Sequence, residues 1–183
     1  MRTEQQFNEV WFDECLKRFT PRIQTQLKNL PFPDDLYGEV ESTFIYGSVS
    51  TGKTIRAAFM MLQEMKNCYL RGESHSVYFV SFPELFAEIK ETFNNMEKRE
   101  SEVLKRYLNV NLLVIDDFLS CRPTEWVMDT LYYLINHRYE YMKKTIITSN
   151  YCLQELEKRM NDQRITSRIN AMCIIEEKKR TWK

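Results

Sequence analysis

The chain has 183 residues, of which 43% are hydrophobic and 28% charged, a composition that excludes an intrinsically disordered protein and suffices for one domain with a substantial core. Lysine and arginine number 26, as do aspartate and glutamate, so net charge does not predict nucleic-acid binding, which would require a local patch. Five cysteines lack metal or redox spacing, and neither a signal sequence nor a run of about 20 apolar residues is visible, so we expect a cytoplasmic protein without a membrane partner.

The first part of the chain is expected to form a helix over residues 4–19, because apolar residues including Phe7, Trp11 and Phe19 recur on roughly one face. Thr20-Pro21 is expected to end this helix. A second proline-rich stretch at residues 31–33 predicts an extended connection. We therefore expect an amino-terminal helix and linker over residues 1–42, followed by a core domain over residues 43–183.

From residue 43 onward, the sequence alternates between short β-rich segments and longer helical stretches. Five strands that alternate with helices predict an α/β fold whose parallel sheet is covered on both faces. Ligands of such folds bind at the carboxyl ends of the strands. The predicted strands are 43–46, 76–81, 111–115, 144–148 and 172–176, and the predicted helices are 53–69, 83–107 with an interruption, 124–142, 152–160 and 163–170.

The strongest motif lies directly after the first predicted strand. Eight residues match the phosphate-binding loop pattern G-x-x-x-x-G-K-[ST] at every fixed position. Two of the four glycines are used here, which indicates a turn that needs backbone freedom. An ordinary strand–helix turn would not require the last three residues together, so the loop predicts nucleotide binding, with a lysine for the phosphates and a threonine hydroxyl for Mg²⁺. The eight residues are Gly47, Ser48, Val49, Ser50, Thr51, Gly52, Lys53 and Thr54.

Polar residues follow two further apolar strands. Asp116 and Asp117 end the third predicted strand, and Asn150 closely follows the fourth. In a phosphate-loop protein, Asp116 would hold Mg²⁺ together with Thr54, while Asp117 would polarise an attacking water. The alternative for the acids is capping of the next helix, and the alternative for Asn150 is ordinary turn chemistry.

Arg164 and Arg168 are four residues apart on the last predicted helix. They are either a solvated basic face or an arginine directed at the γ-phosphate of a neighbouring subunit. A second charged stretch, residues 90–106, mixes both signs. Its mixed charge favours a solvated helix.

Residues 43 to about 176 resemble the AAA+ ATPases, and within them the DnaC/DnaI-type helicase loaders, to which IstB-like ATP-binding proteins are related. The most specific segments are 113–118, 124–151 and 162–169. The resemblance implies a sheet order of 5-1-4-3-2, Mg-ATP bound at subunit interfaces, and an oligomeric ring or spiral. It also implies that Arg168 is the arginine finger, that Arg164 supports it, and that Asn150 is the sensor-one residue. The implied partners are a replicative DNA helicase and single-stranded DNA, and the implied activity is ATP hydrolysis. A resemblance to initiator-type AAA+ proteins would make the stretch 90–106 a contact for single-stranded DNA.

This chain departs from the family pattern in several places. Ser50 stands where AAA+ loops usually have a third glycine, and Asp117 stands where most have glutamate. The chain ends soon after the fifth predicted strand, so the helical lid is expected to be largely absent, with Arg180 as a candidate substitute for lid contacts. Only about 40 residues precede the core, so we expect the helix at 4–19 to contact the helicase or the contact to differ from that of other loaders.

Other functions remain open from the sequence alone. An ATPase subunit of a transposition system would share the core and bind duplex DNA. A small-molecule P-loop kinase would act without a neighbouring subunit, although Asp116, Asp117 and the two arginines argue against it. A scaffold that holds ATP without hydrolysing it is compatible with the shorter side chain of Asp117.

Overall fold

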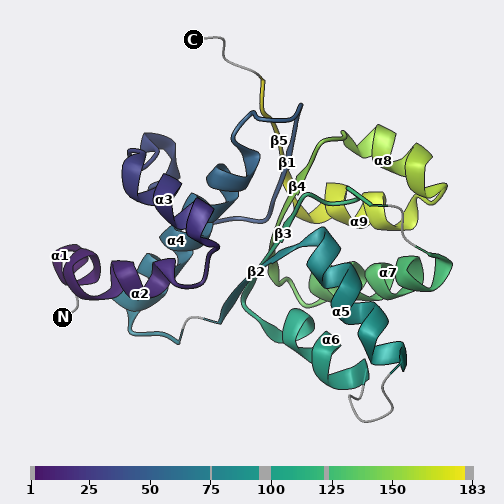
Figure 1. Ribbon diagram of the computed structural model, residues 1–183, viewed down its shortest axis with the longest axis horizontal. Helices are drawn as coiled ribbons and strands as arrows, with labels where there is room; N and C mark the ends of the chain where they lie inside the picture. Colours follow the sequence, from purple (N-terminus) through teal and green to yellow (C-terminus); the bar gives the residue numbers. More distant parts are fainter. Residues whose placement is uncertain (1–2, 75, 95–99, 122–123, 180–183) are drawn as a thin grey trace.

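The computed structural model describes residues 3–74, 76–94, 100–121 and 124–179, in which five parallel strands form one sheet (Figure 1). The strands are β1 (Thr43–Tyr46), β2 (Val77–Ser81), β3 (Leu112–Asp116), β4 (Lys144–Ser149) and β5 (Ile174–Glu177). Their order is β2-β3-β4-β1-β5, which is the predicted order read from the other edge. Every neighbouring pair is parallel, so the loops after β1, β3 and β4 meet at one edge of the sheet.

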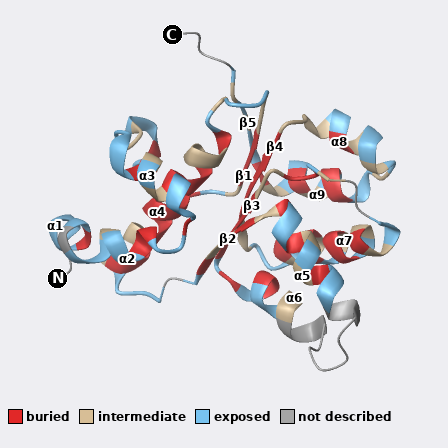
Figure 2. Ribbon diagram, viewed as in Figure 1, coloured by how far each residue is buried: buried red, intermediate tan, exposed pale blue. Residues whose placement is uncertain are grey.

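Helices cover both faces of the sheet (Figure 1). One face packs against α4 (Lys53–Arg71) and the amino-terminal helices, and its core includes Ile45, Val114 and Ile146. The other face packs against the remaining helices, and its core includes Phe44, Leu113 and Ile147. Successive residues of each central strand thus alternate between two apolar layers, as burial on both faces requires. Figure 2 shows these buried strands between the half-buried helices. The helices of the second layer are α5 (Phe82–Asn94), α6 (Glu100–Asn109), α7 (Glu125–Glu140), α8 (Leu153–Met160) and α9 (Arg164–Met172).

The amino-terminal segment differs from the single helix expected over residues 4–19. It contains α1 (Glu4–Gln6), a π-helical stretch (Phe7–Trp11) and α2 (Phe12–Leu16). Pro21 then begins a further helix, α3 (Pro21–Asn29), rather than only ending the first. Proline is favoured at a first helical position because its missing N–H has no intrahelical partner there. A short 3₁₀ turn, Asp34–Leu36, completes the segment.

The other predicted elements are confirmed with shifts of a few residues at their ends. The long helix expected at 83–107 is indeed interrupted and forms α5 and α6. No helix in the described ranges is long and apolar enough to cross a membrane. Residues 95–99 of the mixed-charge stretch 90–106, and Arg180, the candidate for lid contacts, lie outside the described residues.

Candidate nucleotide-binding site

The loop after β1 has the backbone freedom that its glycines predict. Gly52 immediately precedes α4 with a left-handed φ of 83°. Gly47 has a φ of 149°, and a Cβ at this position would lie 2.2 Å from the carbonyl oxygen of Lys178, so only glycine fits. Ser50, the residue in place of a third glycine, also has a left-handed φ of 65°. The departure from the family pattern therefore falls at a position whose geometry favours glycine.

Lys53 is the first residue of α4, and its side chain turns back over the loop. Its Nζ donates hydrogen bonds to the carbonyl oxygens of Gly47 at 2.9 Å and Ser48 at 2.8 Å. It also donates to Oδ1 of Asn150 at 2.9 Å. Lys53 is 8% exposed, so this ammonium is held among oxygen atoms at the carboxyl edge of the sheet.

Asp116, at the end of β3, is bonded to hydroxyl groups from two sides. Thr54 Oγ1 donates to its carboxylate at 3.0 and 3.1 Å, and Thr148 Oγ1 donates at 2.6 Å. Thr148 also accepts a hydrogen bond from the backbone N–H of Asp117 at 2.9 Å. The predicted pair of Thr54 and Asp116 is therefore adjacent in space, and Thr148 links both acids to β4.

Asn150 lies between the phosphate loop and the second acid. Its Nδ2 donates to Oδ1 of Asp117 at 3.0 Å, while its Oδ1 accepts from Lys53. Asp117 has a left-handed φ of 56°, a conformation that aspartate tolerates better than most residues. The three side chains thus form a continuous chain of hydrogen bonds from the loop to β3.

Burial shifts the pKa values of Asp116 and Lys53 in opposite directions. It raises the pKa of Asp116, against the effect of the hydrogen bonds from Thr148 and Thr54. It lowers the pKa of Lys53, while the charges of Asp117 and Asp116 act in the opposite direction. Each charged group is therefore partly desolvated and has only incomplete compensation from its neighbours.

These residues fit Mg²⁺ and a nucleotide phosphate. Within the described residues there is no cluster of three or more His, Cys, Asp or Glu side chains that would hold a metal by itself. Mg²⁺ usually takes one or two carboxylates and completes its shell with water and phosphate oxygens. One half-buried carboxylate beside a threonine hydroxyl is such a donor set, and a cation there would offset the desolvation that raises the pKa of Asp116.

A cleft of about 1010 Å³ opens beside these groups. Val49 to Thr54 line it, as do Asp116, Asp117 and Asn150. The structure therefore brings the loop, both acids and the asparagine to one cavity, as the sequence predicts. Thr148 also lines this cleft and is one of several polar lining residues that the sequence did not indicate. Its signal was a threonine two residues before Asn150, directly after Ile146 and Ile147.

Arg168 does not line that cleft. Its Nε donates to Oδ1 of Asn136 at 2.8 Å, and its guanidinium lies 5.2 Å from the ring centroid of Tyr139. Arg164 is exposed and pairs with Asp162 and with Asp129 of α7. Both arginines thus contact α7, on the face of the sheet opposite α4.

The sheet order, the loop and the polar residues at the strand ends agree with one family of ATP-binding proteins. The family model for IstB-like ATP binding proteins matches residues 6–173. The chain belongs to this family. The phosphate loop at residues 47–54 lies within the part of the chain that matches the IstB-like family.

Among curated proteins, the phage-like element PBSX protein XkdC of Bacillus subtilis is 26% identical over 137 residues, which are 72% of this chain and 47% of that protein. The initiator DnaA of Lacticaseibacillus casei is 30% identical over 69% of this chain and 26% of its own length. The replicative helicase loader DnaC of Escherichia coli is 24% identical over 72% of this chain and 51% of its own. This IstB-like chain matches only about half of the length of these relatives, or less.

Solved structures share the fold. A crystal structure of the DnaC helicase loader has a TM-score of 0.64 at 24% identity and covers 97% of this chain and 100% of that chain. A crystal structure of DnaI has a TM-score of 0.61 at 22% identity over 97% and 86%. DnaA bound to AMPPCP and single-stranded DNA has a TM-score of 0.60 at 25% identity over 87% and 44%. The five-stranded parallel sheet is that of the AAA+ P-loop proteins.

Proposed function

We propose that this IstB-like protein is an ATPase of the helicase-loader type, which binds Mg-ATP at subunit interfaces and engages single-stranded DNA and a replicative helicase. The observation that carries this proposal is the hydrogen-bond chain from Lys53 through Asn150 to Asp117. It connects the group that would contact the phosphates with the group that would polarise water. A site that only held a nucleotide would not need that connection.

Each residue of the cleft has a distinct role in this proposal. Lys53 binds the β- and γ-phosphates by exchanging its loop carbonyls for phosphate oxygens. Thr54 and Asp116 hold Mg²⁺, which when bound neutralises charge on the phosphate oxygens. Asp117 and Asn150 orient the attacking water. Thr148 fixes the positions of the two acids through its hydrogen bonds to the Asp116 carboxylate and the Asp117 N–H.

Arg168 completes the site of a neighbouring subunit. Its position outside the cleft supports a role in trans, because its own subunit gives it no access to the phosphates that Lys53 would bind. The contacts with Asn136 and Tyr139 hold the guanidinium on the surface of α9. Such a preorganised arginine stabilises charge that develops during phosphoryl transfer.

The partners follow from the relatives rather than from a visible surface. A curated relative is a replicative helicase loader, and a structural neighbour is an initiator bound to single-stranded DNA. The mixed-charge stretch 90–106 is the proposed DNA contact, although its central residues 95–99 lie outside the described ones. The helical segment predicted at 4–19, which contains α1, the π-helical stretch and α2, remains the proposed contact for the helicase.

The proposal is tested by measuring ATP turnover per subunit over a wide range of protein concentration, with and without single-stranded DNA. A rate per subunit that rises with concentration and responds to DNA is expected, since a neighbour completes each site. A concentration-independent rate that ignores DNA would contradict the loader assignment. It would favour a monomeric P-loop kinase, if phosphate reached an acceptor, or a nucleotide-holding scaffold.

Arg168→Ala tests the interface directly. This variant should bind ATP normally but lose turnover by about 10³-fold, the lower end of arginine-finger effects. Mixing it with Lys53→Ala should restore part of the activity, because intact sites form where Lys53 of one subunit meets Arg168 of another. Lys158→Ala, which removes an exposed cation of the neighbouring α8, is the matched control. Absence of any recovery on mixing would place Arg168 outside the neighbouring site.

A transposition-associated ATPase is the second candidate, because the family model that matches this chain is that of IstB-like proteins. Such a subunit would bind duplex DNA. Titration of labelled single-stranded and duplex oligonucleotides of one sequence separates the two. Tighter binding to the single strand supports a loader, and tighter binding to the duplex supports the transposition-associated function.

A further inference from the structure

The amino-terminal segment forms part of the wall of the nucleotide cleft. Besides the loop and the strand ends, the cleft is lined by the residues that join α2 to α3 and begin α3, which we call the α2–α3 elbow (residues 18–26). Arg18, Arg22 and Gln26 of the elbow line the cleft. The segment that precedes the core is therefore in position to contact what the phosphate loop binds.

The elbow is anchored by an apolar row next to this polar row. Phe19, Ile23 and Leu27 are 5%, 7% and 3% exposed. The ring of Phe19 meets Phe79 of β2 edge-on, with centroids 5.4 Å apart. Ile23 and Leu27 are four apart on one side of α3, so burying them fixes the side on which Arg22 lies. The packing of Phe19 anchors the turn that carries Arg18. The two arginines are therefore presented by packed structure.

The two arginines lack charged partners of their own. Among the described residues, no carboxylate lies within ion-pair distance of either. Arg18 has only a long hydrogen bond, 3.5 Å, to the carbonyl of Val77. Arg22 lies in the first turn of α3, where the helix dipole disfavours a cation. By contrast, Lys28 at the other end of α3 pairs with Asp13 at 2.9 Å. An anion in the cleft would neutralise the charge of Arg22 and offset its unfavourable interaction with the dipole of α3.

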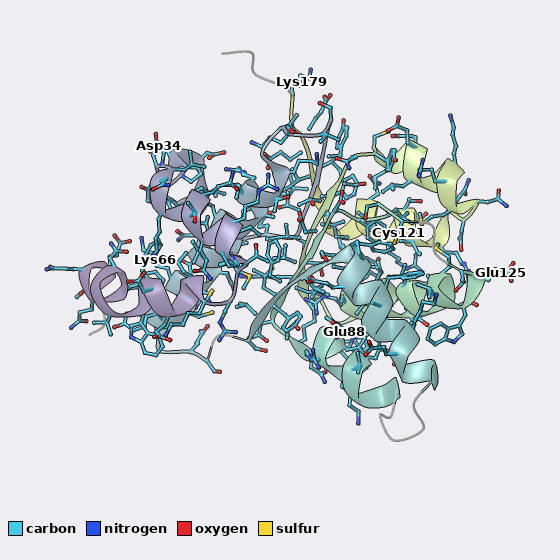
Figure 3. All side chains as sticks on the ribbon, viewed as in Figure 1. Asp34, Lys66, Glu88, Cys121, Glu125 and Lys179 are labelled. Carbon is cyan, nitrogen blue, oxygen red and sulfur yellow. The ribbon has the colours of Figure 1, made fainter. Side chains whose placement is uncertain are left out.

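The opposite wall of the cleft is acidic. Glu84 and Glu88 of α5 line it together with Asp116 and Asp117. Figure 3 labels Glu88 on α5, across the strands from the amino-terminal helices. Both glutamates already have partners, Ser81 for Glu84 and Tyr107 for Glu88. A continuous polyanion such as a DNA strand would meet these carboxylates, whereas a single terminal phosphate that carries Mg²⁺ would not be repelled in the same way.

We propose that Arg22, supported by Arg18, contacts the γ-phosphate of ATP bound in the same subunit. This inference rests on the proposed function, because it requires ATP at the phosphate loop. It adds a γ-phosphate contact in cis to the contact in trans from Arg168. Because the elbow connects α3 with α1 and α2, the amino-terminal surface then responds to whether ATP or ADP is bound.

The test is a comparison of two affinities in the full chain. We would measure the Kd values of a non-hydrolysable ATP analogue and of ADP, both with Mg²⁺, for the parent, Arg22→Ala, Arg18→Ala/Arg22→Ala and Lys28→Ala. Loss of a charge-assisted contact predicts about tenfold weaker binding of the ATP analogue by Arg22→Ala and a change below about twofold for ADP. Lys28→Ala removes a cation from the same helix outside the cleft and should leave both affinities unchanged.

Several outcomes would overturn the inference. Equal losses for both nucleotides would mean that Arg22 does not recognise the γ-phosphate, and unchanged affinities would mean that it does not contact the nucleotide. If the double variant lost affinity for a single-stranded oligonucleotide while both nucleotides bound normally, the elbow would be a DNA contact. If the parent bound neither nucleotide, the proposed function would itself fail. An intact ADP affinity in Arg22→Ala shows that the variant is folded.

Discussion

Lys53 and Arg138 are the buried cations in the part of the chain that the structure describes. They lie at opposite ends of the strands. Lys53 is 8% exposed and faces the carboxyl ends of the strands, whereas Arg138 is fully buried at their amino ends. Both are held by oxygen atoms. What differs is whether those oxygen atoms can be exchanged for a ligand.

Arg138 is enclosed by the backbone. Its guanidinium donates to the carbonyl oxygens of Tyr107 and Val110 at 2.7 and 3.1 Å, and to Oγ1 of Thr145 at 2.8 Å. Further carbonyls, of Leu108 and Lys144, also accept from it. Burial lowers its pKa to about 9. Its acceptors are fixed by the end of α6, the link to β3 and the start of β4, so this cation stabilises the fold and has no group free to bind a ligand.

Lys53 has acceptors that a phosphate can replace. Two are carbonyls of an exposed loop and the third is the side chain of Asn150. Asp116 and Asp117 contribute favourable charge without a direct hydrogen bond in the described contacts. A buried cation with replaceable partners beside a cleft indicates binding, whereas a cation enclosed by backbone carbonyls of packed elements indicates a structural role.

The largest expected effect is that of Lys53→Ala. This variant should lose ATP turnover entirely and bind ATP at least about 100-fold more weakly, since it removes the one buried cation of the cleft. The free energy of unfolding without nucleotide should change by less than about 1 kcal/mol, because a desolvated charge is removed as well. Calorimetric titration and denaturant unfolding measure the two quantities. Turnover equal to that of the parent would contradict the site assignment.

Arg138→Met should lower the free energy of unfolding and leave ATP affinity unchanged, which is the opposite of the effect expected for Lys53→Ala. The apolar side chain leaves several buried carbonyls without donors, so the free energy of unfolding should fall by about 3 kcal/mol or more. ATP affinity of the fraction that remains folded should match the parent, because Arg138 lies at the edge opposite the cleft. Arg164→Met, an exposed arginine, is the control. A loss below about 1 kcal/mol would show that water satisfies those carbonyls.

Lys53 and Arg138 also differ in how far the sequence predicts their positions. The loop, both acids and Asn150 were predictable, because each combines an apolar strand with polar residues at its end. Arg138 occupies the next position of the buried stripe formed by Leu131 and Leu134 on α7, but a charged residue on such a stripe is ordinarily assigned to the surface. Its burial depends on the carbonyls of Tyr107, Leu108 and Val110, which lie 28 to 31 residues away in the sequence.

The amino-terminal segment was the least predictable part. Thr20-Pro21 predicts the end of a helix equally well whether or not another begins at the proline, and here α3 begins there. The π-helical stretch Phe7–Trp11 changes which residues face the core. Phe7 is 3% exposed, but Val10 is 63% exposed. A uniform helical period cannot predict such a local change.

Thr148→Val tests whether the hydroxyl of Thr148 positions the two acids of the cleft. Valine keeps the shape of the strand but removes the hydroxyl that bonds Asp116 and the backbone of Asp117. We expect turnover to fall by about 10- to 100-fold and a higher Mg²⁺ concentration to be required, since the metal ligand loses its orientation. Thr148→Ser retains the hydroxyl and should keep most of the activity. Equal effects of the two substitutions would assign the loss to packing.

Ser50→Gly should have the smallest effect, and its sign is informative. A non-glycine residue at a φ of 65° is strained by about 1–2 kcal/mol, while glycine costs about 0.5–1 kcal/mol through the entropy of the unfolded chain. The net expectation is a gain of up to about 1 kcal/mol in the free energy of unfolding. Ser48→Gly, in the same exposed loop but without a positive φ, should lose stability instead. If both glycines destabilised the protein equally, Ser50 would not be strained, and its departure from the family pattern would have no cost.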